Sequence, residues 1–336
     1  MFNPSLSQHS LSLIDLSIII VNWNSADFLQ ACLTSIYKTV QETRFEVIVA
    51  DNASVDGCEA MLRHDYPEVR FIGATENLGF ARANNVAYLQ SRGETLLFLN
   101  PDTELMESAL DRMFGLLQAH PSIGALGPRL YNADGTVQES CVQAFPTLTN
   151  QFLDASLLRK WFPRWSIWGA CALDEPERGP IDVDAISGAC FMVSRGVFES
   201  VGRFTEDYFM YSDDLDLSYK IRRAGYSVVC LTNCAVRHYG GGSSSRRDPR
   251  FAAVQRRQAM SQFFRRTRGP WCSGAYRVLV SAAAILRMGV ACIALPFAAS
   301  SEKRDRLQCV LIRWRSILRW ALGIEMTVKD IQSFHV

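Results

Sequence analysis

Short apolar runs alternate with amphipathic segments over the first hundred residues. Four short runs predict strands: 15–22, 45–50, 69–72 and 95–99. The first is continuously apolar, as is typical of a strand that is buried on both faces of a parallel sheet. After the first run, Asn24 or Ser25 can cap a helix whose apolar residues recur at helical spacing: Phe28, Leu29, Cys32, Leu33 and Ile36. Strands that alternate with helices in this way predict right-handed βαβ units and an α/β fold.

The pattern changes after residue 105. The turn Asn132-Ala133-Asp134-Gly135 predicts a hairpin over 124–137. Further strands are expected at 186–193 and 227–231, the second leading into a loop with His238 and three glycines, and a helix at 213–224 that Gly225 ends. Between them lies an aromatic segment that suits either an interfacial loop or plain core burial: Trp161, Phe162, Trp165 and Trp168.

Composition places the chain among globular proteins. Of its 336 residues, 48% are hydrophobic and 21% are charged, which excludes wholesale disorder. The ten cysteines show no paired metal-ligand spacing, and their scatter through apolar runs indicates reduced core cysteines such as Cys32, Cys190 and Cys230. The N-terminus has no basic region followed by an apolar stretch, so we expect no secretory signal and a cytoplasmic location.

The net charge of +1 hides an asymmetry. Residues 246–319 hold sixteen Lys and Arg against three acidic residues, so the remainder of the chain is acidic. A basic C-terminal tail after an acidic N-terminal part suggests that the tail faces an anionic surface. By charge alone, this surface could be either lipid or nucleic acid.

Polar side chains follow each of the four predicted strands of the first half. They are Asn22-Trp23-Asn24, Asp51-Asn52, Asn77 with Gly79, and Asn100-Pro101-Asp102. Ligands of open α/β sheets bind at the carboxyl ends of the strands, so four polar ends at one sheet edge indicate a binding site. Any one of them alone would more often be a helix cap.

Five segments in order resemble the blocks of glycosyltransferase family 2: SIIIVNWNSADFLQACLTSI, VADNASVDG, ENLGFARANN, LLFLNPDTEL and ISGACFMVSRGVFESVGRFTEDYFMYSDDLDLSYKIRRAGY. Within the family they are most similar to rhamnosyltransferase-type enzymes of bacterial surface polysaccharide synthesis. The resemblance implies a GT-A fold, with a Rossmann-like, mixed and mainly parallel sheet, an inverting mechanism and a divalent metal, Mg²⁺ or Mn²⁺.

The resemblance also implies a donor site. Its expected residues are Asn22, Trp23, Asn24, Asp51, Asn52, Asn77, Gly79, Arg82 and Asn100. Asp51 would accept hydrogen bonds from the base or ribose, and Asp102, at the position of the DxD motif, would hold a metal that neutralises the leaving diphosphate. The first acid of that motif is Asn100 here, which predicts loose metal binding. Glu104 could assist the metal or favour a helix dipole.

The Asp213-Asp214 pair matches the Glu-Asp-x-Asp block of the family, with Asp213 in place of the usual Glu. The resemblance implies that Asp214 is the base that takes the acceptor hydroxyl proton. It also implies that Ser187, Gly188 and Ala189 form the floor of the acceptor site. His238 either completes the metal site or is structural.

The tail contains two apolar segments. Residues 278–299 are nearly long enough to span a bilayer, but Arg287 lies near their middle. Residues 303–322 align Leu307, Leu311, Trp314, Leu318 and Leu322. This pattern fits a basic amphipathic helix on an anionic membrane, and equally a helix packed on the catalytic domain.

The organisation we expect is a tail at 1–14, a catalytic domain at 15–245 and a basic helical region at 246–336. The catalytic domain would divide into a nucleotide-sugar half, 15–104, and an acceptor half, 105–245. Its donor would be dTDP-rhamnose or a UDP-sugar and its acceptor a lipid-linked or cell-surface glycan, with no nucleic acid as partner.

Three other functions compete with this prediction. A processive synthase would carry Gln-x-x-Arg-Trp, whereas Gln308 has the wrong spacing to Arg313-Trp314. A nucleotidyltransferase would need a glycine-rich basic loop where Trp23-Asn24 stands. A non-catalytic glycan-binding protein would leave Asp102 and Asp214 unexplained.

Overall fold

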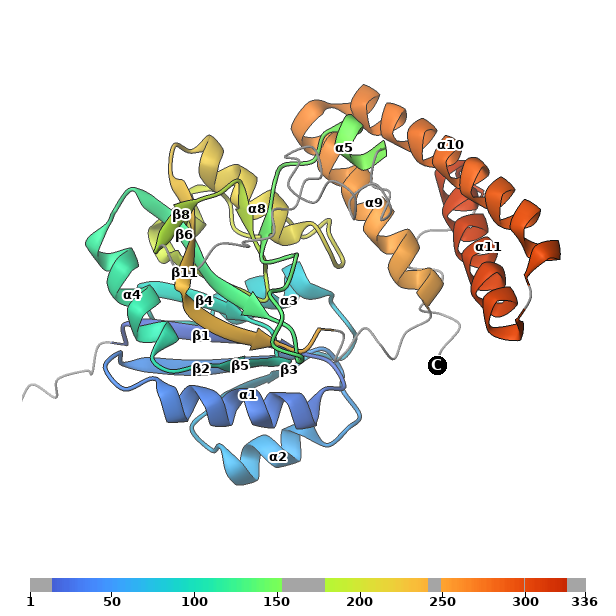
Figure 1. Cartoon of the computed structure of the whole chain (residues 1–336). Helices are drawn as coiled ribbons and strands as arrows, with labels where there is room; N and C mark the ends of the chain where they lie inside the picture. Colours follow the sequence, from blue (N-terminus) through green and yellow to red (C-terminus); the bar gives the residue numbers. More distant parts are fainter. Residues whose placement is uncertain (1–13, 153–178, 241–248, 299, 325–336) are drawn as a thin grey trace, which may run out of the picture.

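The computed structural model describes residues 14–152, 179–240, 249–298 and 300–324. The aromatic segment from Trp161 to Trp168 and the N-terminal tail before residue 14 lie outside these ranges. The described chain forms a mixed sheet with helices on both faces, and three long helices at one end (Figure 1). The predicted α/β fold with a helical appendage is therefore confirmed.

The first half of the chain builds parallel βαβ units, as its apolar runs predict. Its elements are β1 (Leu16–Asn22), α1 (Ala26–Thr39), β2 (Phe45–Asp51), α2 (Cys58–Asp65), β3 (Arg70–Gly73), α3 (Phe80–Tyr88) and β4 (Thr95–Leu99). Strands β3, β2, β1 and β4 are neighbours in that order, all parallel. The N-terminus of α1 is capped by Asp56, whose carboxylate accepts from the Ala26 backbone N at 2.8 Å, rather than by the side chain of Asn24 or Ser25.

The second half adds antiparallel strands to this sheet. Its elements are β5 (Thr103–Leu105), α4 (Ala109–Ala119), β6 (Ile123–Tyr131), β7 (Val142–Gln143), α5 (Leu148–Phe152), β8 (Pro180–Asp182), β9 (Ala185–Ile186), β10 (Cys190–Ser194), α7 (Arg195–Ser200), α8 (Asp213–Arg223) and β11 (Ser227–His238). The sheet order continues β4-β10-β6-β11-β5, and β10 is antiparallel to both of its neighbours.

Three of the predicted elements differ from the observed ones. The hairpin over 124–137 is reduced to a single bridge between Tyr131 and Val137, because β6 pairs with β10 and β11 instead. The strand expected at 186–193 is divided into β9 and β10 by Ser187-Gly188-Ala189. The strand expected to end at residue 231 continues through an irregularity to His238, which therefore lies on β11 and not in a loop.

The core cysteines are buried as predicted: Cys32, Cys190 and Cys230 are 0%, 1% and 0% exposed. Small side chains of this polarity pack like aliphatic ones between sheet and helices. The core residues of the sheet and its helices form one continuous cluster, which fixes where the strand ends lie.

The C-terminal region is a three-helix bundle of α9 (Pro249–Arg268), α10 (Pro270–Ala294) and α11 (Ser301–Ala321), with a short turn η2 (Leu295–Phe297). Two adjacent phenylalanines of α9 belong to different hydrophobic clusters. Phe263 packs with Ala185 and Leu215 of the catalytic region, whereas Phe264 packs with Tyr276 and the other bundle residues. Helix α9 therefore joins the bundle firmly to α8.

The buried face of α11 differs from the predicted stripe. Trp314, Ile317 and Trp320 are buried in the bundle core, whereas Leu307, Leu311 and Leu318 are half-buried and Leu322 is 59% exposed. The apolar residues that remain exposed are mainly on α10, and include Val278, Ile285, Val290 and Ile293. Among the described helices, α10 with its following turn is the one that is long and apolar enough to cross a membrane.

Candidate active site

A cleft of about 1720 Å³ runs along the carboxyl ends of the strands of the first half and continues to the helical bundle. Five of the predicted donor residues line it: Trp23, Asn52, Asn77, Gly79 and Asn100. The predicted metal ligands Asp102 and His238 line it too, as do Ser187, Gly188, Asp213 and Asp214. The strand ends thus meet in one cavity, although they are widely separated in sequence.

Loops at the donor end are tied to one another by amide side chains. Asn52 accepts from the Leu78 backbone N and donates to the Gly79 carbonyl, both at 3.2 Å. Gly79 has a φ of +81°, and a Cβ there would come within 2.3 Å of the Phe209 carbonyl oxygen. Only glycine fits at this position.

Five predicted site residues lie off the cleft. Asp51 is 5% exposed, and its carboxylate accepts from Asn22 Nδ2 at 2.9 Å and from the Ser54 backbone N at 2.8 Å. Asn24 accepts from the Val55 backbone N, and Arg82 is exposed on α3. Asp51, Asn22 and Asn24 therefore hold the loop after β2 in place. Ala189, from the predicted acceptor floor, is also buried behind the cleft, where its carbonyl accepts from the Asn100 backbone N.

A carboxylate and an imidazole meet at the ends of β4 and β11. Asp102 Oδ1 lies 3.3 Å from His238 Nε2, and both side chains are mostly buried. Gln138 Oε1 accepts from His238 Nδ1 at 2.8 Å, and Asn100 Nδ2 lies 3.3 Å from Nε2. Neighbouring side chains therefore hold both ring nitrogens of His238, with Nε2 on the side of Asp102.

His238 Nε2 faces the carboxylate of Asp102, and an imidazole nitrogen beside a carboxylate oxygen is a donor set that suits Mn²⁺ and Mg²⁺. No third His, Cys, Asp or Glu joins the pair among the residues that the structure describes. Such cations usually bind proteins through one or two side chains and complete their coordination with substrate phosphates and water. Glu104 is engaged elsewhere, since it accepts from Arg237 at 3.3 Å and from Tyr239 Oη at 2.8 Å.

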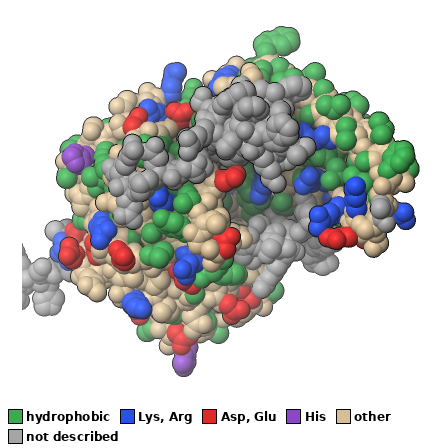
Figure 2. Space-filling view, viewed as in Figure 1, with side chains coloured by type: hydrophobic (Ala, Val, Ile, Leu, Met, Phe, Trp, Pro, Cys, Tyr) green, Lys and Arg blue, Asp and Glu red, His purple; other side chains and the backbone are tan. Residues whose placement is uncertain are grey.

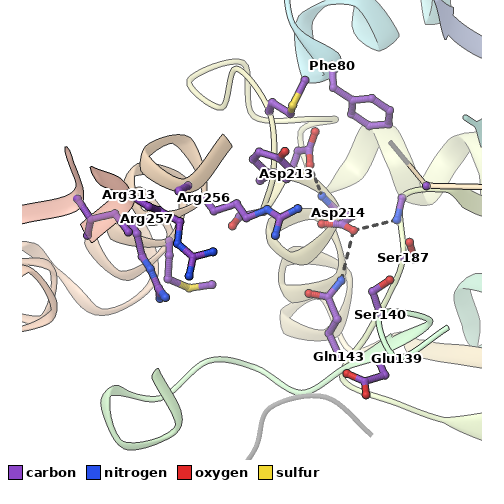
Figure 3. Close-up of a pocket in the computed structure, with 18 of the residues that line it drawn as sticks. Phe80, Glu139, Ser140, Gln143, Ser187, Asp213, Asp214, Arg256, Arg257 and Arg313 are labelled. Carbon is purple, nitrogen blue, oxygen red and sulfur yellow. Dashed lines mark hydrogen bonds between the residues drawn. The ribbon is translucent and has the colours of Figure 1, made fainter. Parts of the chain in front are cut away.

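The aspartate pair begins α8. Tyr211 and Ser212 precede it with φ values of 69° and 61°, a left-handed conformation that is uncommon for residues other than glycine. Asp214 Oδ2 accepts from the Gly188 backbone N at 2.8 Å and from Gln143 Nε2 at 3.4 Å (Figure 3). A Cβ on Gly188 would lie 3.2 Å from Asp214 Cβ, so the small residue permits this close approach.

Burial is the main factor that raises the pKa of the Asp213 and Asp214 carboxyls. The neighbouring Asp214 charge raises the pKa of Asp213 further. Asp213 Oδ2 is buried with no hydrogen-bond donor among the described residues. Asp214 is less buried, opens onto the cleft, and lies beside Gln143, Ser140 and Ser187 (Figure 3). Asp214 is therefore the carboxyl of the pair that a ligand in the cleft could reach.

Several residues of the cleft carry no recognisable signal in the sequence. Gln138 and Ser140 lie in an irregular segment after β6, and Gln143 ends the short strand β7. The bundle contributes a second group of lining residues, which includes Arg256, Arg257, Arg287 and Arg313. The sequence showed an excess of basic residues in the tail, but it did not show which of these residues line the cleft.

The sheet order and the cleft across its strand ends define a GT-A glycosyltransferase that acts on a nucleotide sugar. Two solved structures share the fold. One is the mannosyltransferase PcManGT from Pyrobaculum calidifontis in complex with GDP-Man and Mn²⁺, with TM-score 0.53 and 18% identity over 91% of this chain and 87% of that chain. The other is GalNAc-T7 with UDP, GalNAc and Mn²⁺, with TM-score 0.59 and 16% identity over 96% of this chain and 58% of that chain.

The family follows from sequence comparison. The model of Glycosyl transferase family 2 matches residues 17–202, and the chain belongs to that family. The N-acetylglucosaminyl-diphospho-decaprenol L-rhamnosyltransferase of Mycobacterium tuberculosis is 32% identical over 247 residues, which cover 70% of this chain and 78% of the relative. The predicted family is therefore confirmed.

Proposed function

We propose that this protein is an inverting, metal-dependent transferase that moves a deoxyhexose, rhamnose in the first instance, from a nucleotide diphosphate to a lipid-linked glycan. The sugar and the acceptor are suggested by the name of the mycobacterial relative. The observation that carries the proposal is that Asp214 and the Asp102–His238 pair open into the same cleft. Transfer needs both elements: a base for the acceptor hydroxyl and a partner for the departing diphosphate.

At the donor end, Asn52, Asn77 and Trp23 would surround the nucleotide, and Gly79 allows its close approach. Asp102 and His238 would hold Mn²⁺ or Mg²⁺, with Gln138 orienting the imidazole. When bound, the cation supplies positive charge that stabilises the leaving diphosphate. Residues 15–104 would thus form the donor half and 105–245 the acceptor half.

At the acceptor end, Asp214 would accept the proton of the attacking hydroxyl at its carboxylate. The backbone N–H groups of Gly188 and Leu215, both at 2.8 Å from its oxygens, orient the carboxylate. Ser187 and Gly188 form the floor beneath the acceptor sugar. Attack from this side, opposite the diphosphate, would invert the configuration at the anomeric carbon.

A matched pair of donor and acceptor tests this function. Purified protein would be incubated with dTDP-rhamnose or UDP-sugars, Mn²⁺, and a lipid diphosphate that carries N-acetylglucosamine. We expect mass spectrometry to detect a product with one of the donors, and NMR to show that its anomeric configuration is inverted. The variant Asp214→Asn should give almost no product. A product of retained configuration, or transfer that is unaffected by EDTA, would contradict the proposal.

We also propose that the protein acts at the inner face of the cell membrane. Exposed apolar residues of α10, such as Ile285 and Ile293 at 61% and 71% exposure, would lie in the lipid interface, and basic residues of α11 would face anionic headgroups. Ile285→Glu with Ile293→Glu should abolish flotation with anionic vesicles while donor binding persists. The equivalent charge introduced at Val55, which is exposed in the loop after β2 and outside the bundle, serves as control for flotation. Equal flotation of all three proteins would refute the membrane contact.

A further inference from the structure

The cleft does not end at the aspartate pair. Beyond Asp214 it is walled by the bundle, and four arginines from three helices line this part: Arg256 and Arg257 of α9, Arg287 of α10 and Arg313 of α11. We call these four residues the arginine wall. None of the residues that the described bundle helices contribute to the cleft is acidic. Figure 2 shows the hollow, with Lys and Arg side chains along its bundle side.

Aromatic rings hold much of the arginine wall in position. The guanidinium carbons of Arg257 and Arg287 lie 5.9 and 4.5 Å from the centre of the same Trp314 ring, and that of Arg256 lies 4.9 Å from the Tyr211 ring. Stacking on a ring orients a guanidinium while leaving its N–H edge able to donate. Arginines gathered in one concave wall favour a ligand with several anionic oxygens.

The position of Arg287 on α10 supports this interpretation. An arginine near the middle of an apolar helix is costly when it faces lipid. Here it lies over Trp314 and lines the cleft, whereas Ile285 and Ile293 of the same helix are exposed. The charge thus faces the cleft, and the apolar face of the helix is left uninterrupted.

Apolar residues continue the cleft past the arginine wall. Leu286 and Val290 of α10, and Leu307 and Val310 of α11, line it. Leu286 and Val290 are 66% and 60% exposed, so this part of the cleft opens onto the exposed apolar face of α10. An elongated ligand would therefore meet the aspartate pair, then cations, then an apolar channel.

We propose that the arginine wall binds the diphosphate of an isoprenoid-type lipid acceptor, with the lipid chain between α10 and α11 and the acceptor sugar at Asp214. This inference rests on the proposed function and names the acceptor class for the same site. Arginine suits the ligand because its planar group donates two hydrogen bonds to one phosphate. Figure 3 shows Arg256 pointing from α9 towards Asp213 and Asp214, with Arg257 and Arg313 behind it.

The donor diphosphate is a less suitable occupant. Its expected partners, Asp102 and His238, come from the ends of β4 and β11, whereas the arginine wall comes entirely from the bundle. A donor bound at the wall would also leave the apolar channel without an occupant. Anionic phospholipid headgroups share the phosphate chemistry, but they would have no reason to reach the aspartate pair.

The test uses the full chain and the double variant Arg256→Gln with Arg313→Gln. The control is Arg315→Gln, which removes an exposed charge from α11 outside the cleft. Two binding probes are compared: a fluorescent short-chain isoprenyl diphosphate, and the matching isoprenol without phosphate. The dissociation constant of the diphosphate should rise by about a hundredfold in the double variant, about tenfold per charge-assisted contact, and that of the isoprenol should not change.

Kinetics separate this inference from the proposed function. In the double variant, the KM for the lipid-diphosphate acceptor should rise, while the KM for the nucleotide sugar stays as in the wild type. If the wild type uses no lipid-linked acceptor, the proposed function itself fails. If it does, but the double variant keeps its acceptor KM, the arginine wall is not the acceptor site. Weakened donor binding would assign the wall to the donor, and a loss of vesicle binding alone would assign it to phospholipid; either result would overturn the inference.

Discussion

The replacement of Asp214 by Asn tests the catalytic assignment most directly. It removes the proton acceptor and keeps nearly the same shape. The carboxylate now accepts from the backbone N of Gly188 and of Leu215, on different oxygens and both at 2.8 Å. An amide has one oxygen, so one of these N–H groups loses its acceptor, at a cost of about 1–3 kcal/mol in stability. Removal of a charge that burial disfavours offsets part of this cost.

The expected catalytic loss is larger than the structural one. A positioned general base contributes about 10²–10⁴-fold, which corresponds to an increase of about 3–5 kcal/mol in the activation free energy. We therefore expect the kcat of Asp214→Asn to fall at least about a hundredfold, with the donor dissociation constant within about threefold of wild type. The measurements are initial rates at saturating donor and acceptor, calorimetric donor binding, and thermal melts.

Asp213→Asn is the matched control, because it makes the same chemical change one residue earlier, where the side chain is 5% exposed. We expect it to retain more activity than Asp214→Asn. Turnover near the wild-type level in Asp214→Asn, or a greater loss in Asp213→Asn, would refute the assignment of the base.

Three further outcomes follow from the geometry. Burial first, and the Asp214 charge second, raise the pKa of Asp213 from 3.8 to about 8. The folded state therefore binds the Asp213 proton more tightly than the unfolded chain does. The free energy of unfolding falls as pH rises between these two pKa values. Asp213→Asn should therefore raise Tm more at about pH 8 than at about pH 4, and equal gains would contradict this. Asp102→Ala should make donor binding insensitive to EDTA, and His238→Ala should weaken Mn²⁺-dependent donor binding about tenfold; calorimetry that shows full Mn²⁺ dependence in both would exclude them as ligands. Phe263→Ala should lower the free energy of unfolding by about 3–5 kcal/mol in denaturant melts, because the side chain is 1% exposed, and a loss below about 1 kcal/mol would mean that α9 is not firmly docked.

The parallel half of the fold was predictable from sequence because each strand there is a continuous apolar run followed by a helix. The antiparallel half was not, since its pairing depends on contacts distant in sequence. Strand β10 enters between β4 and β6, and this removes the partner that a local hairpin at 124–137 would have needed. Likewise, the last residues of β11 are polar and read as a loop, yet Val236 and His238 pair with β5.

The candidate site follows the same division. Strand-end residues such as Asn52 and Asp102 could be predicted to converge, because parallel strands end at one edge. The sequence could not predict which of these residues face the cavity. Asp51, for example, lies behind the cleft, because Asn22 and the Ser54 backbone donate hydrogen bonds to its carboxylate. Gln138 and Arg256 could not be singled out either. Their roles arise from the packing of β11 and α9 against the sheet, and a single sequence does not encode that placement in any local pattern.

The two adjacent phenylalanines of α9 have a consequence for the exchange of parts between related enzymes. Phe263 belongs to the core around α8, and Phe264 to the core of the bundle. A chimera joined after Arg268 would keep α9 but give it foreign neighbours on its Phe264 side. A chimera joined before Pro249 would replace α9 together with the bundle, and Leu215 and Ala185 would then face a foreign helix. The bundle can therefore be transplanted only together with the surface of α8 that Phe263 contacts, so the two regions should diversify as one unit.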